Sequence, residues 1–484
     1  MAKRNILLTV GLAVSALLLL FLMAGQAQQV IAINNAPRAL AQGITHTVYI
    51  PSIARNYNPD YIPSFGIIMY GNVDNANGLQ QMQDAGSKWI TTKLDWSSIE
   101  ATEGIYDWSG FDTKAQNAQA AGMDLFVLFT ENPSWAASLP GGPVTDTQDL
   151  VDFVTLMAER YDCDGIDDAS GSPCVNYWSF YAEPDNGDLG RAKQGKGYWG
   201  HNGSGYAAML YQISPAIHSA NPRAQVLIGG LAYDYFEEDN PSNPFVRDFL
   251  TDTLTALNTY PGGADTYLNA VAFHFYPISA DRWPTIREKT WEIAGIMTNH
   301  GVGDLPLISP EMGYWSSSKH GSSEEGQARR LAQMYARSLS VGLHSLSWYK
   351  VFDDAVAGSI EDEYPDSTSG LFRLNGSKKP SYYAYQTMTE ELHGAIYSRE
   401  LGAAGAEGYV FDMLDGKEKT VVWSSSGTVH VDFSYSHVRL VDTQGNVFDI
   451  QDGDTTTPGD LDGSVNGVIR LEIHENQPYY VGQE

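Results

Sequence analysis

The segment from residue 177 to residue 186 reads Tyr177-Trp178-Ser179-Phe180-Tyr181-Ala182-Glu183-Pro184-Asp185-Asn186. An aromatic run stops at a single carboxylate, Glu183, and a proline follows. This pattern is typical of a buried strand that brings one acid to the rim of a barrel and then turns. A Glu-Pro pair alone also occurs in many ordinary turns. The interpretation therefore depends on whether the chain supplies a barrel around Glu183 and a second carboxylate opposite it.

Short apolar runs alternate with helical periodicity from residue 64 onwards. The candidate strands are Phe65–Tyr70, Trp89–Leu94, Leu125–Phe129, Asn176–Tyr181, Gln225–Gly230, Ala270–Phe275, Pro306–Ser309 and His344–Tyr349. Amphipathic helical stretches between them are Phe111–Ala121, Leu150–Arg160, Gly205–Ala220, Thr285–Asn299, Gln327–Val341 and Pro380–Leu392. Eight strands that alternate with helices predict an α/β fold, namely a (β/α)₈ TIM barrel over residues 63–395.

After residue 395 the pattern changes to short alternating runs separated by turn signals such as Asp415-Gly416 and Gln444-Gly445. The expected strands are Tyr409–Met413, Lys419–Trp423, Val429–Phe433, Val438–Asp442, Asn446–Ile450, Val468–Ile473 and Tyr479–Val481. These features predict a small antiparallel, sandwich-like β domain over residues 396–484. The segment Asp460–Asn466 resembles half a calcium loop, but it lacks a helix and a closing acid, so we interpret it as a hairpin loop.

The N-terminus has the composition of an export signal. Lys3 and Arg4 precede an apolar run, Ile6–Met23, which ends in the small-residue segment Ala24-Gly25-Gln26-Ala27. We predict a signal peptide over residues 1–27 and a linker over residues 28–62, and hence a secreted, extracellular protein without membrane association after cleavage. The alternative is an uncleaved N-terminal membrane anchor, because the apolar run is long.

Composition narrows the classes of function. The 484 residues are 43% apolar and 18% charged, with a formal net charge of −29, which indicates a globular and strongly acidic chain. An acidic surface repels phosphate backbones, so we expect no nucleic acid partner, whereas a neutral substrate is compatible with it. The histidines lack metal-ligand spacing, so we predict no metal. We also expect no organic cofactor.

The two cysteines, Cys163 and Cys174, are predicted to form a disulfide in an exported protein. The loop around them is rich in acidic residues, namely Asp162, Asp164, Asp167 and Asp168. Closely spaced carboxylates are typical both of a solvated acidic loop and of a calcium site. The sequence leaves both interpretations of this loop open.

A second carboxylate follows the seventh predicted strand. That strand delivers Glu311, so Glu183 and Glu311 are expected to face the same barrel mouth from opposite sides. Glycoside hydrolysis requires such a pair, because one acid protonates the leaving oxygen while the other carboxylate attacks the anomeric carbon or activates water. The sequence contains no Gly-x-Ser-x-Gly elbow, which is the motif expected of a serine hydrolase. No phosphate-binding or dinucleotide motif follows a predicted strand.

Other strand ends supply candidate substrate contacts. Alternation places His274 and Tyr276 on one side of the sixth strand, where the tyrosine either holds a carboxylate or packs in the core. Trp348, after the eighth strand, is expected to form the floor of a sugar subsite, since sugar rings stack on indole faces. Further candidates at the mouth are Lys93, Trp96, Asn132, Asn186 and Trp315. Glu131 is a third acid, for which substrate binding or a salt bridge is expected.

Several motifs at these strand ends belong together: Trp96-Ser97-Ser98-Ile99-Glu100, Gly104-Ile105-Tyr106-Asp107-Trp108, Pro133-Ser134-Trp135, Glu183-Pro184-Asp185-Asn186, His274-Phe275-Tyr276, Glu311-Met312-Gly313, Trp348 and Lys379-Pro380-Ser381-Tyr382-Tyr383-Ala384-Tyr385. In combination they resemble glycoside hydrolase clan A, the 4/7 superfamily of retaining glycosidases, with closest similarity to families 39 and 5. The resemblance implies Glu183 as acid/base, Glu311 as nucleophile, Tyr276 as the partner of the nucleophile and Trp348 as a subsite platform.

The chain departs from the clan at two positions. Ala182 stands where the clan usually has an asparagine that contacts the sugar 2-hydroxyl, a contact that contributes several kcal/mol in the transition state. Asn186 or Asn132 could replace it. Lys93 stands where an arginine often supports the nucleophile, and lysine gives a point charge without the bidentate fork.

The sequence therefore predicts a secreted retaining glycoside hydrolase that cleaves β-linked oligo- or polysaccharides by double displacement. The alternative, motivated by Ala182, is a non-catalytic carbohydrate-binding protein built on a glycosidase barrel. A third possibility is that the β domain binds a cell-surface polymer through Trp423, Tyr479 and Tyr480. The sugar, its linkage and exo or endo action depend on the loops around the mouth.

Overall fold

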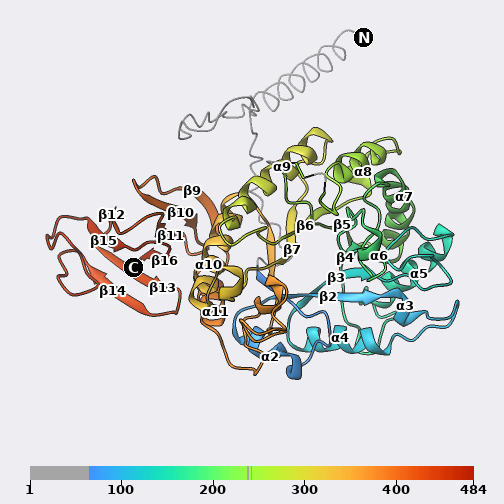
Figure 1. The fold of residues 1–484 in the computed structure, drawn as a ribbon, viewed down its shortest axis with the longest axis horizontal. Helices are drawn as coiled ribbons and strands as arrows, with labels where there is room; N and C mark the ends of the chain where they lie inside the picture. Colours follow the sequence, from blue (N-terminus) through green and yellow to red (C-terminus); the bar gives the residue numbers. More distant parts are fainter. Residues whose placement is uncertain (1–64, 237–238, 241) are drawn as a thin grey trace, which may run out of the picture. The chain divides into compact units, whose positions relative to one another are not determined.

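The computed structural model describes residues 65–236, 239–240 and 242–484, so the expected signal peptide and linker lie outside the described residues. Parallel strands form a closed barrel (Figure 1). The strand order is β1 to β8, and β1 is hydrogen-bonded to β8. These strands are β1 (Phe65–Ile68), β2 (Trp89–Asp95), β3 (Asp124–Thr130), β4 (Tyr177–Phe180), β5 (Gln225–Leu231), β6 (Ala270–Phe275), β7 (Leu307–Met312) and β8 (Ser345–Trp348). The predicted fold class, a TIM barrel followed by an antiparallel β domain, is confirmed.

Helices connect the strands on the outside of the barrel (Figure 1). They are α2 (Leu79–Asp84), α3 (Trp96–Ile99), α4 (Ser109–Ala120), α5 (Thr147–Arg160), α6 (Leu189–Ala192), α7 (Gly203–Ala220), α8 (Phe249–Leu257), α9 (Ile286–Asn299), α10 (Glu324–Ser340) and α11 (Pro380–Glu391). Asp146, Asn202 and Ser323 begin α5, α7 and α10 by accepting a backbone N–H, which satisfies donors that have no partner within the helix. The short α2 and the threonine-rich α8 were not predicted. The six residues of α2 are too few to show a helical period, and the threonines of α8 have a weak helix propensity.

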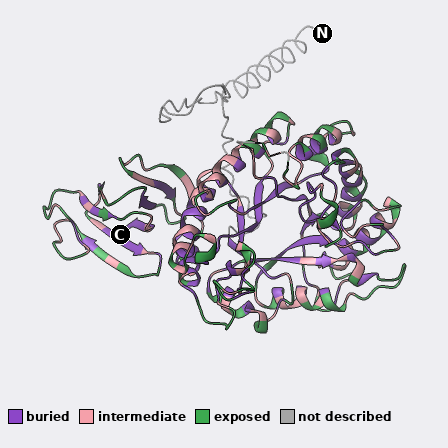
Figure 2. Ribbon diagram, in the orientation of Figure 1, coloured by how far each residue is buried: buried purple, intermediate pink, exposed green. Residues whose placement is uncertain are grey.

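Side chains alternate across each barrel strand, and the two sets form two different cores. One buried cluster contains inward-facing residues, namely Trp89, Phe126, Leu128, Tyr177, Ala182, Leu227, Ala270, Ala272 and Ile308. The alternate residues, such as Ile90, Val127 and Trp178, belong to a second cluster shared with the helices. Figure 2 accordingly shows buried strands surrounded by helices whose outer faces are exposed. Gly66 is required beside Trp89, because a Cβ at residue 66 would lie 2.5 Å from the indole ring.

The C-terminal β domain has a six-stranded sheet in the order β14-β13-β16-β11-β10-β9 and a two-stranded sheet of β12 and β15. Its strands are β9 (Ile396–Glu400), β10 (Ala406–Asp412), β11 (Glu418–Ser424), β12 (Val429–Phe433), β13 (His437–Asp442), β14 (Val447–Gln451), β15 (Ile469–Ile473) and β16 (Tyr479–Gln483). Inward-facing residues of the two sheets, including Val422, Val431 and Leu471, share one core. Strand β9 was not predicted, since its exposed, polar sequence lacks a clear apolar alternation.

The β domain packs directly on the barrel. Arg337 of α10 forms a bidentate pair with Glu407 of β10, with nitrogen–oxygen distances of 2.5 and 2.6 Å. The Trp283 and Trp423 rings meet with centroids 6.5 Å apart, and Tyr480 is fully buried. Because Trp423 and Tyr480 are buried, they cannot form an exposed sugar-binding surface on the β domain.

The cysteine loop forms as predicted, with a disulfide between Cys163 and Cys174. Carboxylate oxygens of Asp162, Asp164 and Asp168 lie within 4.8 Å of one another. Asp162 and Asp168 accept N–H groups of the loop backbone, which are the contacts of an ordinary acidic turn. No helix within the described part of the chain is long and apolar enough to cross a membrane.

Candidate active site

Glu183 reaches the barrel mouth through an unusual backbone path. Strand β4 ends at Phe180, and both Tyr181 and Glu183 adopt left-handed conformations, with φ of 60° and 55°. Residues other than glycine seldom take up this conformation, and it is concentrated at functional sites. A Cβ at Gly229 would lie 1.8 Å from the Tyr181 carbonyl oxygen, so this turn fits only against a glycine of β5. The turn leaves the Glu183 side chain buried in the mouth.

Glu311 lies within β7, directly opposite His274 of β6 in the register of the sheet. Its carboxylate accepts hydrogen bonds from two tyrosines: Tyr276, at 2.7 Å, and Tyr70. Burial, and next the Glu311 charge, raises the pKa of both hydroxyl groups above the ordinary value, so both remain protonated donors. The contact expected between Tyr276 and Glu311 is present. Tyr70 was missed, although it ends the first predicted strand at the same rim as Glu183.

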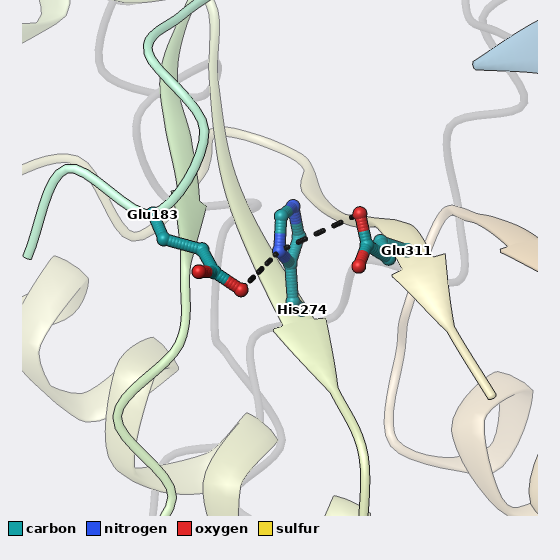
Figure 3. Close-up of side chains that lie close together, drawn as sticks. All are labelled: Glu183, His274 and Glu311. Carbon is teal, nitrogen blue, oxygen red and sulfur yellow. Dashed lines mark hydrogen bonds and ion pairs between the residues drawn. The ribbon is translucent and has the colours of Figure 1, made fainter. Parts of the chain in front are cut away.

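His274 lies between the two glutamates (Figure 3). Its Nδ1 is 3.5 Å from Glu183 Oε1 and 3.8 Å from Glu311 Oε2. Lys289 fixes the backbone at this point by donating to the His274 carbonyl oxygen at 2.6 Å. Gly230 makes room for the ring, because a Cβ there would lie 2.0 Å from Nε2. An oxygen of each glutamate and a nitrogen of His274 all lie within 4.8 Å of one another.

Two cations contact the other oxygen of Glu183. Arg191 of α6 lies 2.5 Å and Lys196 3.7 Å from Glu183 Oε2. Burial alone raises the pKa of Glu183, but Lys196, a hydrogen bond from His274, and Arg191 together outweigh burial and hold the pKa below its usual value. Neither cation was predicted from the sequence. Both lie on a polar segment after β4, which contains the single-turn helix α6 and has no extended apolar periodicity.

Asp185, two residues beyond Glu183, is a structural carboxylate. It is buried and accepts the N–H groups of Ala232 and Tyr233 at 2.9 to 3.1 Å. Burial raises the pKa of Asp185 to about 7, and Lys289 offsets this effect only in part. These hydrogen bonds tie the end of β4 to the segment after β5 and stabilise the turn that presents Glu183.

The prediction that Trp348 forms a sugar platform is wrong. Trp348 is fully buried, stacks on Tyr335 of α10 and donates its Nε1 proton to Ser369. Strand alternation explains the error, because Trp348 points outward with Leu346, whereas the next residue, Tyr349, faces the barrel interior. The Tyr349 ring lies 5.7 Å from Tyr276 and 6.3 Å from Tyr70, so it is the aromatic residue beside Glu311.

The other two tryptophans predicted at the mouth are also structural. Trp96 is fully buried, packs edge-on against Trp135 and donates to the Glu100 carboxylate at 2.7 Å. Trp315 is buried, stacks on Tyr314 with centroids 4.9 Å apart, and donates to a backbone oxygen. Neither indole offers an exposed face to a sugar, so these two predicted contacts are not realised.

The polar candidates Asn132, Asn186 and Lys93 contact protein groups around the two glutamates. Asn132 accepts the Tyr181 hydroxyl at 2.8 Å, and its Nδ2 donates to a loop carbonyl. Asn186 donates to Gly197 at 2.8 Å. Both are buried and bonded within the protein, so neither replaces an asparagine at position 182. The Lys93 ammonium lies 4.6 Å from the centre of the Tyr70 ring, and it therefore reaches Glu311 through Tyr70.

The donor set of Glu183, His274 and Glu311 is of a kind that can also ligate a divalent cation. Arg191 and Lys196 argue against this role, because they already compensate the charge of Glu183 and would repel a metal ion. Two close carboxylates are instead suited to proton transfer and nucleophilic attack at one glycosidic bond.

Comparison with known proteins finds structures of similar fold. No protein-family model and no curated protein matches the sequence. Solved structures do match. A family 39 glycoside hydrolase from the gut symbiont Bacteroides cellulosilyticus WH2 has a TM-score of 0.61 and 18% identity, over 88% of this chain and 81% of that chain. A monomeric β-xylosidase from Caulobacter crescentus CB15 has a TM-score of 0.59 and 12% identity, over 88% and 96%.

A third similar structure is a family 30 endoxylanase from Clostridium papyrosolvens C71, with a TM-score of 0.58 and 12% identity, over 87% of this chain and 96% of that chain. The sequence identities are low, so the likeness concerns the fold. This chain shares the fold of these glycoside hydrolase structures, which agrees with the resemblance seen in the sequence.

Proposed function

We propose that this protein is an exported retaining glycoside hydrolase that acts on β-linked sugars. The observation that carries the proposal is the pair of buried glutamates, Glu183 and Glu311, whose nearest carboxylate oxygens lie within 4.8 Å. Retaining glycosidases hold their two carboxyl groups about 5–5.5 Å apart, whereas inverting enzymes leave about 6.5–9.5 Å for a water molecule. The clan A fold supports the same reaction.

The reaction proceeds in two displacements. Glu311 attacks the anomeric carbon as the glycosidic carbon–oxygen bond breaks, and Glu183 gives its proton to the leaving oxygen. Glu183, now a carboxylate, then removes a proton from water, which attacks the glycosyl–Glu311 ester and releases the sugar with its original configuration. Tyr276 and Tyr70 orient the Glu311 carboxylate, and His274 lies between the two acids.

The sugar ring would stack on Tyr349, which faces the mouth beside Tyr276. The similar structures bear the names of a β-xylosidase, an endoxylanase, a glucosidase and an α-L-arabinofuranosidase, so pentosides and glucosides belong in the first substrate trials. A panel of aryl β-glycosides and plant or microbial polysaccharides is the direct test. Release of reducing sugar is expected, and proton NMR should show the β-anomer forming first; initial formation of the α-anomer would refute retention.

The second candidate is a non-catalytic carbohydrate-binding protein, which Ala182 favours. Its methyl group belongs to the buried interior cluster and cannot form a hydrogen bond with a 2-hydroxyl group. The two functions are separated by the same panel: binding of a polysaccharide without any release of sugar would support the second candidate and exclude the first.

Export is supported by the N-terminal residues 1–27 and by the disulfide between Cys163 and Cys174. Expression of the full chain in a secreting bacterial host tests this part. A medium fraction whose N-terminus begins near residue 28 is expected, whereas a full-length protein in the membrane fraction would indicate an uncleaved anchor.

A further inference from the structure

The acid/base glutamate has two different sides. Glu183 Oε1 faces His274 and the nucleophile, whereas Oε2 faces Arg191 and Lys196. A general acid donates to the leaving group, so the leaving group lies beside Glu183. The two cations therefore flank the leaving-group side of the scissile bond.

Both cations remain accessible to a ligand. The Arg191 and Lys196 side chains are 35% and 37% exposed, while the Glu183 side chain is only 8% exposed. The two cations are thus more exposed to solvent than the carboxylate that they contact. A molecule that approaches Glu183 from the leaving-group side meets the two positive charges first.

The loop that carries these cations is fixed by many contacts. Asp188 accepts the Arg191 N–H at 2.8 Å, and the Arg191 guanidinium lies 4.7 Å from the centre of the Phe245 ring. Near Lys196, the Gly197 N–H donates to the Ala182 carbonyl oxygen at 2.8 Å, and the Gly197 carbonyl oxygen accepts from Asn186. The charges are held in place before substrate arrives, which favours specific recognition.

Glu183 contacts two cations, and Glu311 adds a second negative charge that acts on Lys196. One carboxylate is paired with two cations, in a chain whose formal net charge is −29. Cations beside a general acid also work against its task, because they favour the ionised form. Both features are explained if a second anion, supplied by the substrate, shares these cations.

We propose that Arg191 and Lys196 bind an anionic substituent, a carboxylate or a sulfate ester, on the sugar in the leaving-group subsite. The inference rests on the proposed glycosidase function and names its substrate class. An arginine fork matches a planar carboxylate or a sulfate by two parallel hydrogen bonds, and lysine adds a point charge. When the substrate anion occupies the two cations, their hold on Glu183 weakens, and Glu183 takes up the proton that it later donates.

Binding is the first test, because it does not depend on turnover. Calorimetry compares a hexuronate, a 6-O-sulfated hexose and the neutral hexose on the full-length protein. The wild type is expected to bind one anionic sugar about tenfold more tightly than the neutral sugar. Arg191→Met and Lys196→Met should each remove most of this preference, while Arg191→Lys should keep part of it. The matched control is Lys193→Met, an exposed lysine on the same loop. Thermal melting checks that each variant is folded.

Hydrolysis is the second test. Disaccharides that share the accepted non-reducing sugar carry a uronate, a sulfated hexose or a neutral hexose as leaving group. Preference for the uronate or for the sulfate identifies the anion, and this preference should fall about tenfold in Lys196→Met. Equal binding and equal cleavage of all three sugars by the wild type would overturn the anion site while leaving the glycosidase intact. Anion binding that requires Arg191 and Lys196 but occurs without cleavage of any glycoside would instead refute the glycosidase function alone.

Discussion

Glu183 and Glu311 reach the same barrel mouth, but their surroundings are opposite in kind. Glu311 lies in the regular strand β7 and accepts hydrogen bonds from two neutral tyrosine hydroxyl groups. Glu183 lies beyond the end of β4, on left-handed backbone, and contacts two cations from a loop. Chemically identical side chains are thus prepared for different tasks by what touches them.

The difference agrees with the proposed double displacement. A nucleophile must be oriented along one line of attack, and hydroxyl donors on rigid strands provide this orientation without cancelling its charge. An acid/base must change its protonation state twice, and it therefore benefits from neighbours whose influence changes when substrate binds. The four predictions below test this division of roles.

Replacement of either glutamate should have the largest effect. Glu183→Gln and Glu311→Gln are each expected to reduce kcat at least about a hundredfold, close to 3 kcal/mol in the barrier. Azide separates the two roles in the alanine variants. It should restore turnover of an activated aryl glycoside in Glu183→Ala with a β-glycosyl azide as product, and in Glu311→Ala with an α-glycosyl azide. The reverse pattern of products would exchange the two assignments.

Loss of the tyrosine hydroxyl groups should come next. Tyr276→Phe and Tyr70→Phe each remove a hydrogen bond to the Glu311 carboxylate, worth about 1.5–3 kcal/mol for a charged acceptor, so kcat should fall about tenfold to a hundredfold. KM should change little, because the ring surface is kept. Tyr364→Phe, at a residue 62% exposed, is the control. Unchanged kcat in both site variants would show that Glu311 needs no such support.

The two neighbouring aromatic residues of β8 should respond differently. Tyr349→Ala is expected to raise KM about tenfold through loss of ring stacking. Trp348→Phe should leave KM within about twofold but lower the free energy of unfolding by about 1–3 kcal/mol, because it opens a cavity against α10. Steady-state kinetics and urea unfolding measure the two quantities. A raised KM in Trp348→Phe with an unaffected Tyr349→Ala would restore Trp348 as the platform.

The smallest effect concerns pH. Lys196 favours the ionised form of Glu183 and so lowers its pKa, whereas the general acid must be protonated when substrate binds. Removal of the charge in Lys196→Met should raise the pKa of Glu183. The basic limb of the kcat/KM profile for a neutral aryl glycoside should consequently move to higher pH, and Lys193→Met should leave it in place. A shift of this limb to lower pH would contradict the role given to Lys196.

Much of the fold could be predicted because each barrel strand carries its own local signal. Apolar runs such as Trp89–Leu94 and Ala270–Phe275 are bounded by turns, and they coincide closely with β2 and β6. The short, threonine-rich α8 and the polar β9 were missed. Within the site, the glutamates were found because each follows an apolar run, and Tyr276 was found because alternation places it beside His274.

The tryptophans show where this reasoning failed. Trp96, Trp315 and Trp348 were assigned to the mouth by residue type, since indoles suit both sugars and cores. Alternation, had it been applied to strand β8, would have placed Tyr349 inside and Trp348 outside. For Trp96 and Trp315 the strand pattern ends before the residue, so only the packing of the following loops decides their position.

The sequence by itself determined the barrel and the pair of glutamates, because strand period and strand length place a residue at the rim by local geometry alone. Only the tertiary structure decided which groups touch them. Tyr70 meets Glu311 across 241 residues of chain, and this contact exists only once β1 lies beside β8 in the closed barrel. Arg191 and Lys196 reach Glu183 because the segment that carries them folds back on the turn after β4 and is held there by hydrogen bonds to the backbone of that turn. Such contacts arise from closure of the barrel and from loop packing, which local sequence periodicity does not predict.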